Sequence, residues 1–367
     1  MFSLACVFVE IFAVYKGFSA ENIHDLFEEP KTYAANMDRV LDWVSHKVVE
    51  RCDVQIRELI RNMTLKERKE RLLAREVWEE LVTVRSNRNS SIHFCGACCM
   101  PRNPSDKAVS DTTSLDPAKH GYEDPLLSRS TKKAGNDTEF KMKYEPNERP
   151  PYDWDRNLWL GPSRLVDSVG HSEEEHHLCR KTFWVGNIDD ESKKRKRRQE
   201  VKRAAKAEAE LLEKLAHRHI IKLKGTYRHG DHSFAILLTP VTRYDLSQYL
   251  AMVELNREDG STLGDWQKLL RISLGCLANA IDFLHTRHGL VHGDIEPKNI
   301  LVAPDAYQKI FLSHFEYAAL KQQERDMANI FLGSGRNETQ YVNDVRSQVG
   351  LLLSLIRSCY LHLNDLP

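Results

Sequence analysis

The chain has 367 residues, and its 53 Lys and Arg balance 53 Asp and Glu, so the formal net charge is zero. This balance argues against a general affinity for nucleic acid or for membrane surfaces, and 41% hydrophobic residues are enough for a packed core. Eight cysteines in a chain of this length do not make a disulfide scaffold, so we expect reduced thiols and an intracellular location, cytoplasmic or nuclear.

Residues 2–16 form an apolar run that predicts a helix buried on all sides. The run contains Glu10, lacks a basic flank and is shorter than the ~20 residues of a membrane-spanning helix. We therefore expect a globular helix here rather than an anchor or a signal peptide. Helical periodicity returns over residues 37–63 and 71–81, so residues 1–95 are predicted to form one helical unit.

A small group of thiols follows this helical unit. Cys95, Cys98 and Cys99 lie close together in the sequence, with His93 nearby. A C-x-x-C pair with a histidine can bind zinc, but no second pair of ligands follows at the spacing of a zinc finger. Partly buried thiols are therefore the favoured interpretation, and a metal site is the alternative.

Residues 96–162 are rich in Pro, Ser, Asp, Lys and Gly and show weak apolar periodicity, which predicts a disordered linker. Strand-like and helical segments then alternate over residues 164–238, and a helix opens at Asp245, a plausible N-cap. Six basic residues, 193–198, are similar to a nuclear import signal, but runs of this kind usually form a solvated surface, which is the favoured interpretation.

The most informative stretch is residues 292–299, between an amphipathic run and an apolar strand-like segment. Asp294 and Asn299 stand five residues apart in it, which can aim two oxygen-bearing side chains at one point. In phosphoryl transfer one such group orients the attacking hydroxyl and the other holds Mg²⁺. The stretch resembles the H-R-D-x-x-x-x-N catalytic loop of protein kinases.

Other segments extend this resemblance. Residues 208–223 resemble helix αC and the following strand, and residues 237–241 resemble the kinase hinge. The sequences of these segments are most similar to those of fungal serine/threonine kinase-like proteins. Residues 3–11 resemble the central buried helix of a kinase C-lobe, and residues 71–81 resemble the C-terminal end of a kinase domain.

The resemblance implies an α+β, two-lobed protein-kinase-like fold with an N-lobe over residues 163–241 and a partial C-lobe over residues 242–367. Residues 1–95 would be a helical C-lobe remnant, and residues 343–353 again resemble the start of the central helix. We expect either a fragment of a tandem array or a permuted single kinase in which residues 1–95 contact residues 163–367. A linker of about 60 residues reaches ~40–45 Å, which permits that contact.

The resemblance also assigns roles to individual residues. Asp294 matches the catalytic base and Asn299 a Mg²⁺ ligand, while Glu208 matches the αC glutamate that takes part in ATP binding. Lys298 is a candidate for part of the role of the loop lysine, because Glu296 occupies the usual lysine position. ATP and Mg²⁺ are the cofactors that this family implies.

Several positions depart from the family pattern. His314 stands where the resemblance puts the metal-binding aspartate, Gly293 replaces the loop arginine, and Gly186 falls at the position expected of the ATP-binding lysine, which would leave Glu208 unpaired. Residues 170–177, with three consecutive Glu, occupy the place expected of the glycine-rich loop. The A-P-E motif is missing between Phe315 and residue 344.

Three of these departures, at the ATP-binding lysine, the metal-binding aspartate and the glycine-rich loop, affect Mg²⁺-ATP binding. We therefore expect a pseudokinase with weak or absent ATP binding and phosphoryl transfer, acting as a binding or scaffold module for a protein partner. One alternative is an active Ser/Thr kinase that transfers the γ-phosphate with Asp294 as base. A further alternative is a non-functional gene remnant.

Overall fold

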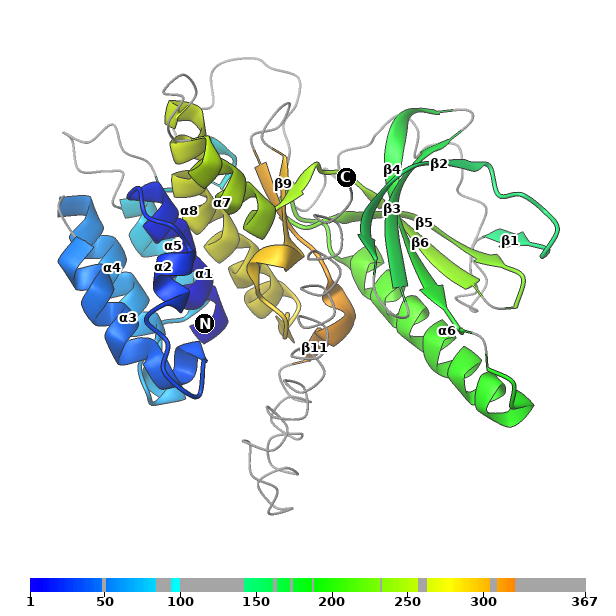
Figure 1. Cartoon of the computed structure of the whole chain (residues 1–367), viewed down its shortest axis with the longest axis horizontal. Coiled ribbons are helices and arrows are strands. Elements are labelled where there is room, and N and C mark those ends of the chain that lie inside the picture. The colour runs from blue at the N-terminus through cyan, green and yellow to red at the C-terminus, as the bar shows by residue number, and fades with distance from the viewer. Residues whose placement is uncertain are drawn as a thin grey trace, which may run out of the picture.

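The structure is a computed structural model, and it describes residues 1–47, 51–83, 94–99, 142–160, 164–171, 174–186, 188–231, 233–256, 263–303 and 309–320. A strand-rich part with one long helix lies beside a helical part, so the fold is α+β with two lobes (Figure 1). The expectations for the A-P-E motif and for residues 343–353 lie outside the described residues.

A six-stranded sheet forms the first lobe, in the order β1-β5-β6-β4-β3-β2. Its pairs are antiparallel except for the parallel pair β1 and β5. The strands are β1 (Met142–Tyr144), β2 (Tyr152–Leu160), β3 (Arg164–His171), β4 (Glu174–Trp184), β5 (Lys222–His229) and β6 (Ser233–Thr239).

Strand β6 shows how this sheet is held. Its side chains alternate between two hydrophobic cores, because successive residues of a strand point to opposite faces. Phe234, Ile236 and Leu238 join the main core. Ala235 and Leu237 join a small second core on the other face, together with Tyr152 from β2.

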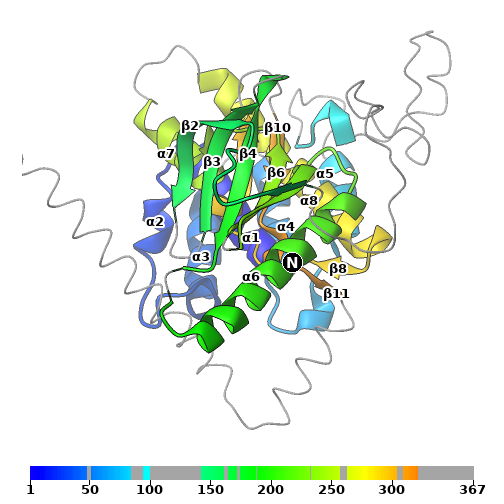
Figure 2. The same ribbon diagram turned by 90° about the vertical axis from the view of Figure 1, so that its right-hand side faces the viewer.

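Helix α6 (Glu191–Lys214) packs on β4, β5 and β6, and Figures 1 and 2 show it lying along one face of the sheet. The helix begins at its N-cap Asp190, whose carboxylate accepts hydrogen bonds from the first-turn amides of Ser192 and Lys193. Its buried positions Val201, Ala205 and Leu212 follow helical spacing, so one face of a mostly charged helix points at the core.

The expectation of a disordered linker over residues 96–162 is wrong at both ends, because residues 97–99 form a 3₁₀ helix and two strands lie in its last part. Residues 142–160 contain β1 and β2, so the sheet begins well before residue 163. Tyr152 is buried and stacks on Tyr227, with ring centroids 5.4 Å apart. These strands are stabilised by non-local pairings that local composition does not reveal. Residues 100–141 lie outside the described residues.

The helical lobe combines segments from both ends of the chain. Its helices are α1 (Phe2–Tyr15), α2 (Glu21–His24), α3 (Tyr33–Lys47), α4 (Arg51–Met63), α5 (Ala74–Thr83), α7 (Leu246–Leu255) and α8 (Leu263–Arg287). Helix α1 contacts α3, α4, α7 and α8, and α5 lies along α8 (Figure 1). Every residue from Leu4 to Val14 is buried, which confirms the prediction of a helix enclosed on all sides.

Residues 1–83 and the later helices therefore share one hydrophobic core. Polar contacts join them as well, since Ser19 Oγ and the Ala20 amide donate hydrogen bonds of 2.8 and 2.7 Å to the carboxylate of Glu254 on α7. The contact between residues 1–95 and the kinase-like part, expected from the sequence as one of two arrangements, is present. Within the described ranges, every helix is too short or too polar to cross a bilayer.

Short strands form two small sheets beside the six-stranded one. β9 (Ile300–Ala303) pairs with β7 (Tyr244–Asp245) and β10 (Lys309–Leu312), and β8 (Leu290–Val291) pairs with β11 (Ala319–Leu320). Leu312 at the end of β10 also exchanges main-chain hydrogen bonds with His219 and Ile221, which follow α6. Residues 292–299 join β8 to β9, and their last residues, 297–299, contact α7 and β7.

Candidate functional site

Asn299 closes the loop of residues 292–299, which we call the 292–299 loop. Its side-chain amide donates hydrogen bonds to the Asp294 carbonyl at 3.0 Å, to Asp294 Oδ2 at 2.8 Å and to Glu296 Oε1 at 3.0 Å. Asn299 is buried in the short 3₁₀ helix η6 (Pro297–Asn299). The amide therefore gathers two carboxylates on one side of the loop.

His292 joins this loop to the segment after β10. Its Nε2 donates to the Ser313 carbonyl at 2.9 Å, because a carbonyl can only accept, and its Nδ1 accepts from the Asp294 amide at 3.3 Å. The ring also packs edge-on against Phe315 in η7 (Phe315–Tyr317). Burial lowers the pKa of His292, which favours the neutral ring that these bonds require.

Glycine is required at position 293 because the backbone of Tyr317 lies very close to it. Its φ is +83°, a region that residues with a Cβ rarely adopt, and a Cβ added there would lie 2.5 Å from the Tyr317 carbonyl oxygen. An arginine at this position is incompatible with the loop as it folds here.

A buried ion pair links the sheet to α6. Lys181 Nζ on β4 lies 2.7 Å from Glu208 Oε2, and the two side chains are 5% and 2% exposed. The expectation that Gly186 occupies the lysine position, and that Glu208 has no partner, is therefore wrong. Gly186 is an exposed residue just after the end of β4, with open space around it.

His314 and Glu316 lie between this ion pair and the 292–299 loop. His314 Nε2 is 3.9 Å from Asp294 Oδ2 and 3.9 Å from Glu316 Oε2. Glu316 Oε2 is in turn 4.0 Å from Lys181 Nζ. A continuous set of charged and polar groups thus runs from α6 through β4 to the 292–299 loop.

Comparison with known proteins agrees with this arrangement. Residues 169–335 match the family described as "Protein kinase domain". This chain carries a protein kinase domain.

Curated relatives are also kinases. The chain is 28% identical over 118 residues to an Aurora kinase of Schizosaccharomyces pombe, covering 32% of this chain and 30% of that protein. It is 25% identical over 132 residues to a G-type lectin S-receptor-like serine/threonine-protein kinase of Arabidopsis thaliana, covering 35% and 15%. It is 31% identical over 107 residues to a putative leucine-rich repeat receptor-like serine/threonine-protein kinase of the same plant, covering 29% and 11%. The chain thus spans less than a third of each of these relatives.

The described residues of the segment 170–177, which are 170, 171 and 174–177, lie at the ends of β3 and β4 that are far from Lys181. Lys181 pairs with Val166 on β3, close to the connection between β2 and β3. Residue 174 is seven positions from Lys181 along β4, a distance of about 23 Å at ~3.3 Å per residue. The expectation that these carboxylates replace the glycine-rich loop is therefore wrong, and the nearer connection, residues 161–163, lies outside the described residues.

Lys298 and Glu296 pair with each other, with Lys298 Nζ 3.0 Å from Glu296 Oε1. Lys298 is 60% exposed, while burial raises the pKa of Glu296, opposed by the nearby lysine. The charge of Lys298 is thus largely compensated by Glu296 within the 292–299 loop.

The residues of this kinase domain fit ATP and Mg²⁺ unequally. The Lys181–Glu208 pair is the group that a kinase fold uses on the α- and β-phosphates, and it is intact. Mg²⁺ prefers oxygen ligands, so the imidazole of His314 is a poor replacement for a carboxylate. The site fits a nucleotide phosphate better than it fits the metal.

Sequence reasoning missed Lys181 and Glu316. A usable signal existed for the lysine, because Cys179 and Phe183 on β4, and Val185 just after it, are buried at alternate positions and Lys181 has the same spacing. A charged residue on the buried face of a strand requires a partner. For Glu316 the sequence offered no comparable signal, since its neighbours come from β4 and from the 292–299 loop.

Proposed function

We propose that this kinase domain is a pseudokinase, a binding or scaffold module for a protein partner with very weak or absent phosphoryl transfer. The observation that carries the proposal is His314, an imidazole where the resemblance puts the metal-binding carboxylate. Because charge stabilisation and positioning supply most of the rate in phosphoryl transfer, loss of the metal ligand removes more than Asp294 as a general base can restore.

The charge balance of the site supports the same conclusion. Asp294, Glu296 and Glu316 bring three carboxyl groups together, while Lys298 is exposed and already paired with Glu296. Triphosphate carries several negative charges, so such a site repels it unless cations compensate.

The intact Lys181–Glu208 pair adds one element to the proposal. A lysine held in place by a buried glutamate provides a fixed positive charge for a phosphate without any metal. We therefore propose that any nucleotide binding is weak and independent of Mg²⁺, and that the domain's role depends on its surface rather than on turnover.

An active Ser/Thr kinase is the second candidate. It is favoured by the Lys181–Glu208 pair and by the carboxylate of Glu316 near His314, which offers an oxygen close to the missing ligand. In this candidate Asp294 is the base, and Asn299 and Glu316 are the groups that would hold Mg²⁺.

Thermal unfolding with ATP, with and without Mg²⁺, distinguishes the candidates when it is combined with a phosphate-incorporation assay on the full chain. The pseudokinase proposal expects the same small stabilisation by ATP in EDTA and in Mg²⁺, or none, and no phosphate incorporation. A stabilisation that requires Mg²⁺, together with incorporation that Asp294→Ala abolishes and the surface variant Asp231→Ala retains, would establish the active kinase instead.

A further inference from the structure

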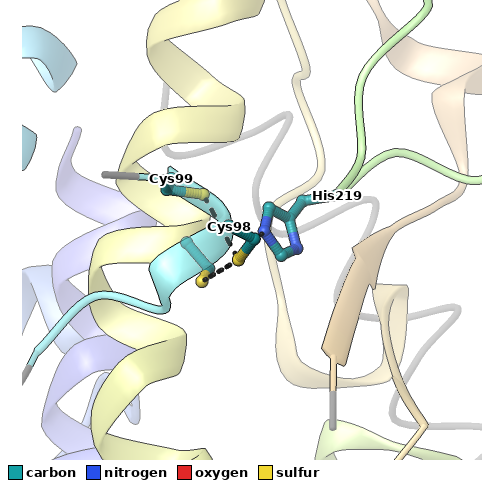
Figure 3. Close-up of side chains that lie close together, drawn as sticks. Cys98, Cys99 and His219 are labelled. Carbon is teal, nitrogen blue, oxygen red and sulfur yellow. Dashed lines mark hydrogen bonds between the residues drawn. The ribbon is translucent and has the colours of Figure 1, made fainter. Parts of the chain in front are cut away.

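Three thiols and one imidazole meet where residues 94–99, which follow the N-terminal helical segment of residues 1–83, contact α8 and the segment after α6. Cys98 and Cys99 belong to the 3₁₀ helix η3 (Ala97–Cys99), Cys276 lies on α8, and His219 lies between α6 and β5. Their four ligand atoms all lie within 4.8 Å of one another. Figure 3 shows the Cys98 sulfur between Cys99 and the ring of His219.

The spacing of these atoms is that of a tetrahedral metal site. Cys98 Sγ is 3.9 Å from Cys99 Sγ, 3.9 Å from Cys276 Sγ and 3.2 Å from His219 Nε2. In a tetrahedral zinc centre with Zn–S bonds of ~2.3 Å, neighbouring sulfurs are about 3.8 Å apart. The sulfurs thus stand at a coordination spacing, well beyond the ~2.05 Å of a disulfide bond.

His219 is oriented as a ligand. Its Nδ1 lies 2.9 Å from the Ile310 carbonyl oxygen, which can only accept, so Nδ1 carries the proton and Nε2 presents its lone pair to the sulfurs. Zinc-binding histidines usually bind the metal through one ring nitrogen while the other donates a hydrogen bond to a backbone carbonyl or a carboxylate.

The surroundings suit a closed structural site. Cys99, His219 and Cys276 are buried, and Cys98 is half-buried, which leaves one side from which an ion can enter. A close approach supports this geometry: a Cβ on Gly275 of α8 would lie 2.6 Å from the Phe94 carbonyl oxygen and from Cys95 Cβ. Glycine at this position lets residues 94–99 lie directly against α8.

We propose that Cys98, Cys99, Cys276 and His219 bind one zinc ion. Three thiolates and one imidazole form a Cys₃His set, which is common among structural zinc sites and whose softness favours zinc over Mg²⁺ or Ca²⁺. The ion connects η3, α8 and the segment after α6. It therefore attaches the N-terminal helical segment to both lobes of the kinase domain, and metal binding contributes to the stability of the folded chain.

The first measurement is the zinc content of the full chain, purified without chelator and analysed by elemental mass spectrometry. We expect about one zinc per chain in the parent protein, and at least a tenfold loss in Cys276→Ser and in His219→Ala. The matched control is Cys6→Ser, which removes another buried helical thiol, in α1, and should keep its zinc.

Cobalt exchange keeps the proposal testable if the variants fail to fold, because it uses the parent chain alone. Replacement of zinc by Co²⁺ should give the strong visible bands of tetrahedral coordination and a thiolate-to-cobalt charge-transfer band. Removal of the metal by a strong chelator should lower the melting temperature of the parent and leave Cys276→Ser unchanged.

Three results would overturn the proposal. One is a zinc content below about a tenth of an equivalent together with an octahedral cobalt spectrum. Another is zinc retained equally in Cys276→Ser and His219→Ala. The third is a disulfide among these cysteines, detected as thiols that resist alkylation of the denatured, unreduced chain.

Discussion

Lys181 on β4 and Glu208 on α6 form a buried ion pair, with Nζ 2.7 Å from Oε2. Removal of the lysine leaves a buried carboxylate without its closest cation. We expect Lys181→Met to lower the free energy of unfolding by about 3–5 kcal/mol, measured by chemical denaturation, because breaking one partner of a buried pair costs that much.

The matched control for this prediction is Lys206→Met on α6, the helix that carries Glu208. Lys206 pairs with Glu210 at the surface, 3.7 Å away, and exposed pairs of this kind contribute roughly 0–1 kcal/mol. Equal effects of the two substitutions would show that the buried pair has no special role in stability.

The error over Lys181 shows what the sequence can and cannot predict. The apolar pattern over residues 183–188 predicted the ATP-binding lysine position at residue 186 instead of 181. The partner Glu208 lies 27 residues after Lys181, on another element. By contrast, local signals were sufficient for Asp245, which caps α7 in a capping box with Gln248. The all-round burial of α1 was also predicted from its composition alone.

The thiol cluster illustrates the same limit. The sequence grouped Cys98 and Cys99 with His93, which lies outside the described residues. The partners found in the structure, His219 and Cys276, are 121 and 178 residues from Cys98. Such groupings depend on tertiary packing, so spacing rules for compact zinc motifs do not detect them.

Gly293 provides a second test of the site. Gly293→Ala places a Cβ 2.5 Å from the Tyr317 carbonyl oxygen at a φ of +83°, so backbone strain and a steric clash add. Gly289→Ala is the control, because its φ of +61° is also positive but nothing lies within 4 Å of the added Cβ. We expect Gly289→Ala to cost about 1 kcal/mol and Gly293→Ala roughly 1–3 kcal/mol more, measured by equilibrium unfolding. Equal costs would mean that the loop relaxes away from Tyr317 without penalty.

His314→Asp should restore a metal ligand to the kinase domain. The new carboxylate would stand near Asp294 and Glu316, where His314 Nε2 now lies 3.9 Å from each. We expect saturating Mg²⁺-ATP to raise the melting temperature of this variant by roughly 5 °C, with a much smaller effect of ATP in EDTA. His229→Asp on β5 is the control and should respond as the parent does. An unchanged response of His314→Asp would indicate that further departures, such as Glu296, prevent metal-nucleotide binding.

Glu10 in α1 makes the stability depend on pH. Burial raises the pKa of Glu10 above its ordinary 4.5, and Glu296 adds to this shift, while the hydrogen bond donated by Tyr33 at 2.9 Å opposes it. The folded state therefore binds this proton more tightly than the unfolded state does. The stabilisation is complete below the ordinary pKa and is lost as the pH rises through the raised value.

Glu10→Gln should abolish this dependence. We expect a higher melting temperature than the parent at pH 8 and a similar one at pH 4, because glutamine matches the protonated carboxyl in shape and charge. The exposed Glu21→Gln is the control and should follow the parent at both pH values. A variant that is less stable than the parent at pH 8 would show that the charged carboxylate is itself stabilising.

The shared core of the helical lobe leads to the last prediction. α1 contacts α7 and α8, and Glu254 on α7 accepts hydrogen bonds from Ser19 and from the Ala20 amide. Residues 1–99 and 100–367, expressed together as separate chains, should therefore associate and co-purify, because each alone exposes the apolar surface that the other covers. Val7→Asp should abolish co-purification, since Val7 is 1% exposed and a buried charge is very costly, whereas Leu73→Asp at a 64% exposed position should not. Failure of the unmodified pair to associate, when both parts are soluble, would mean that the covalent connection is required for this packing.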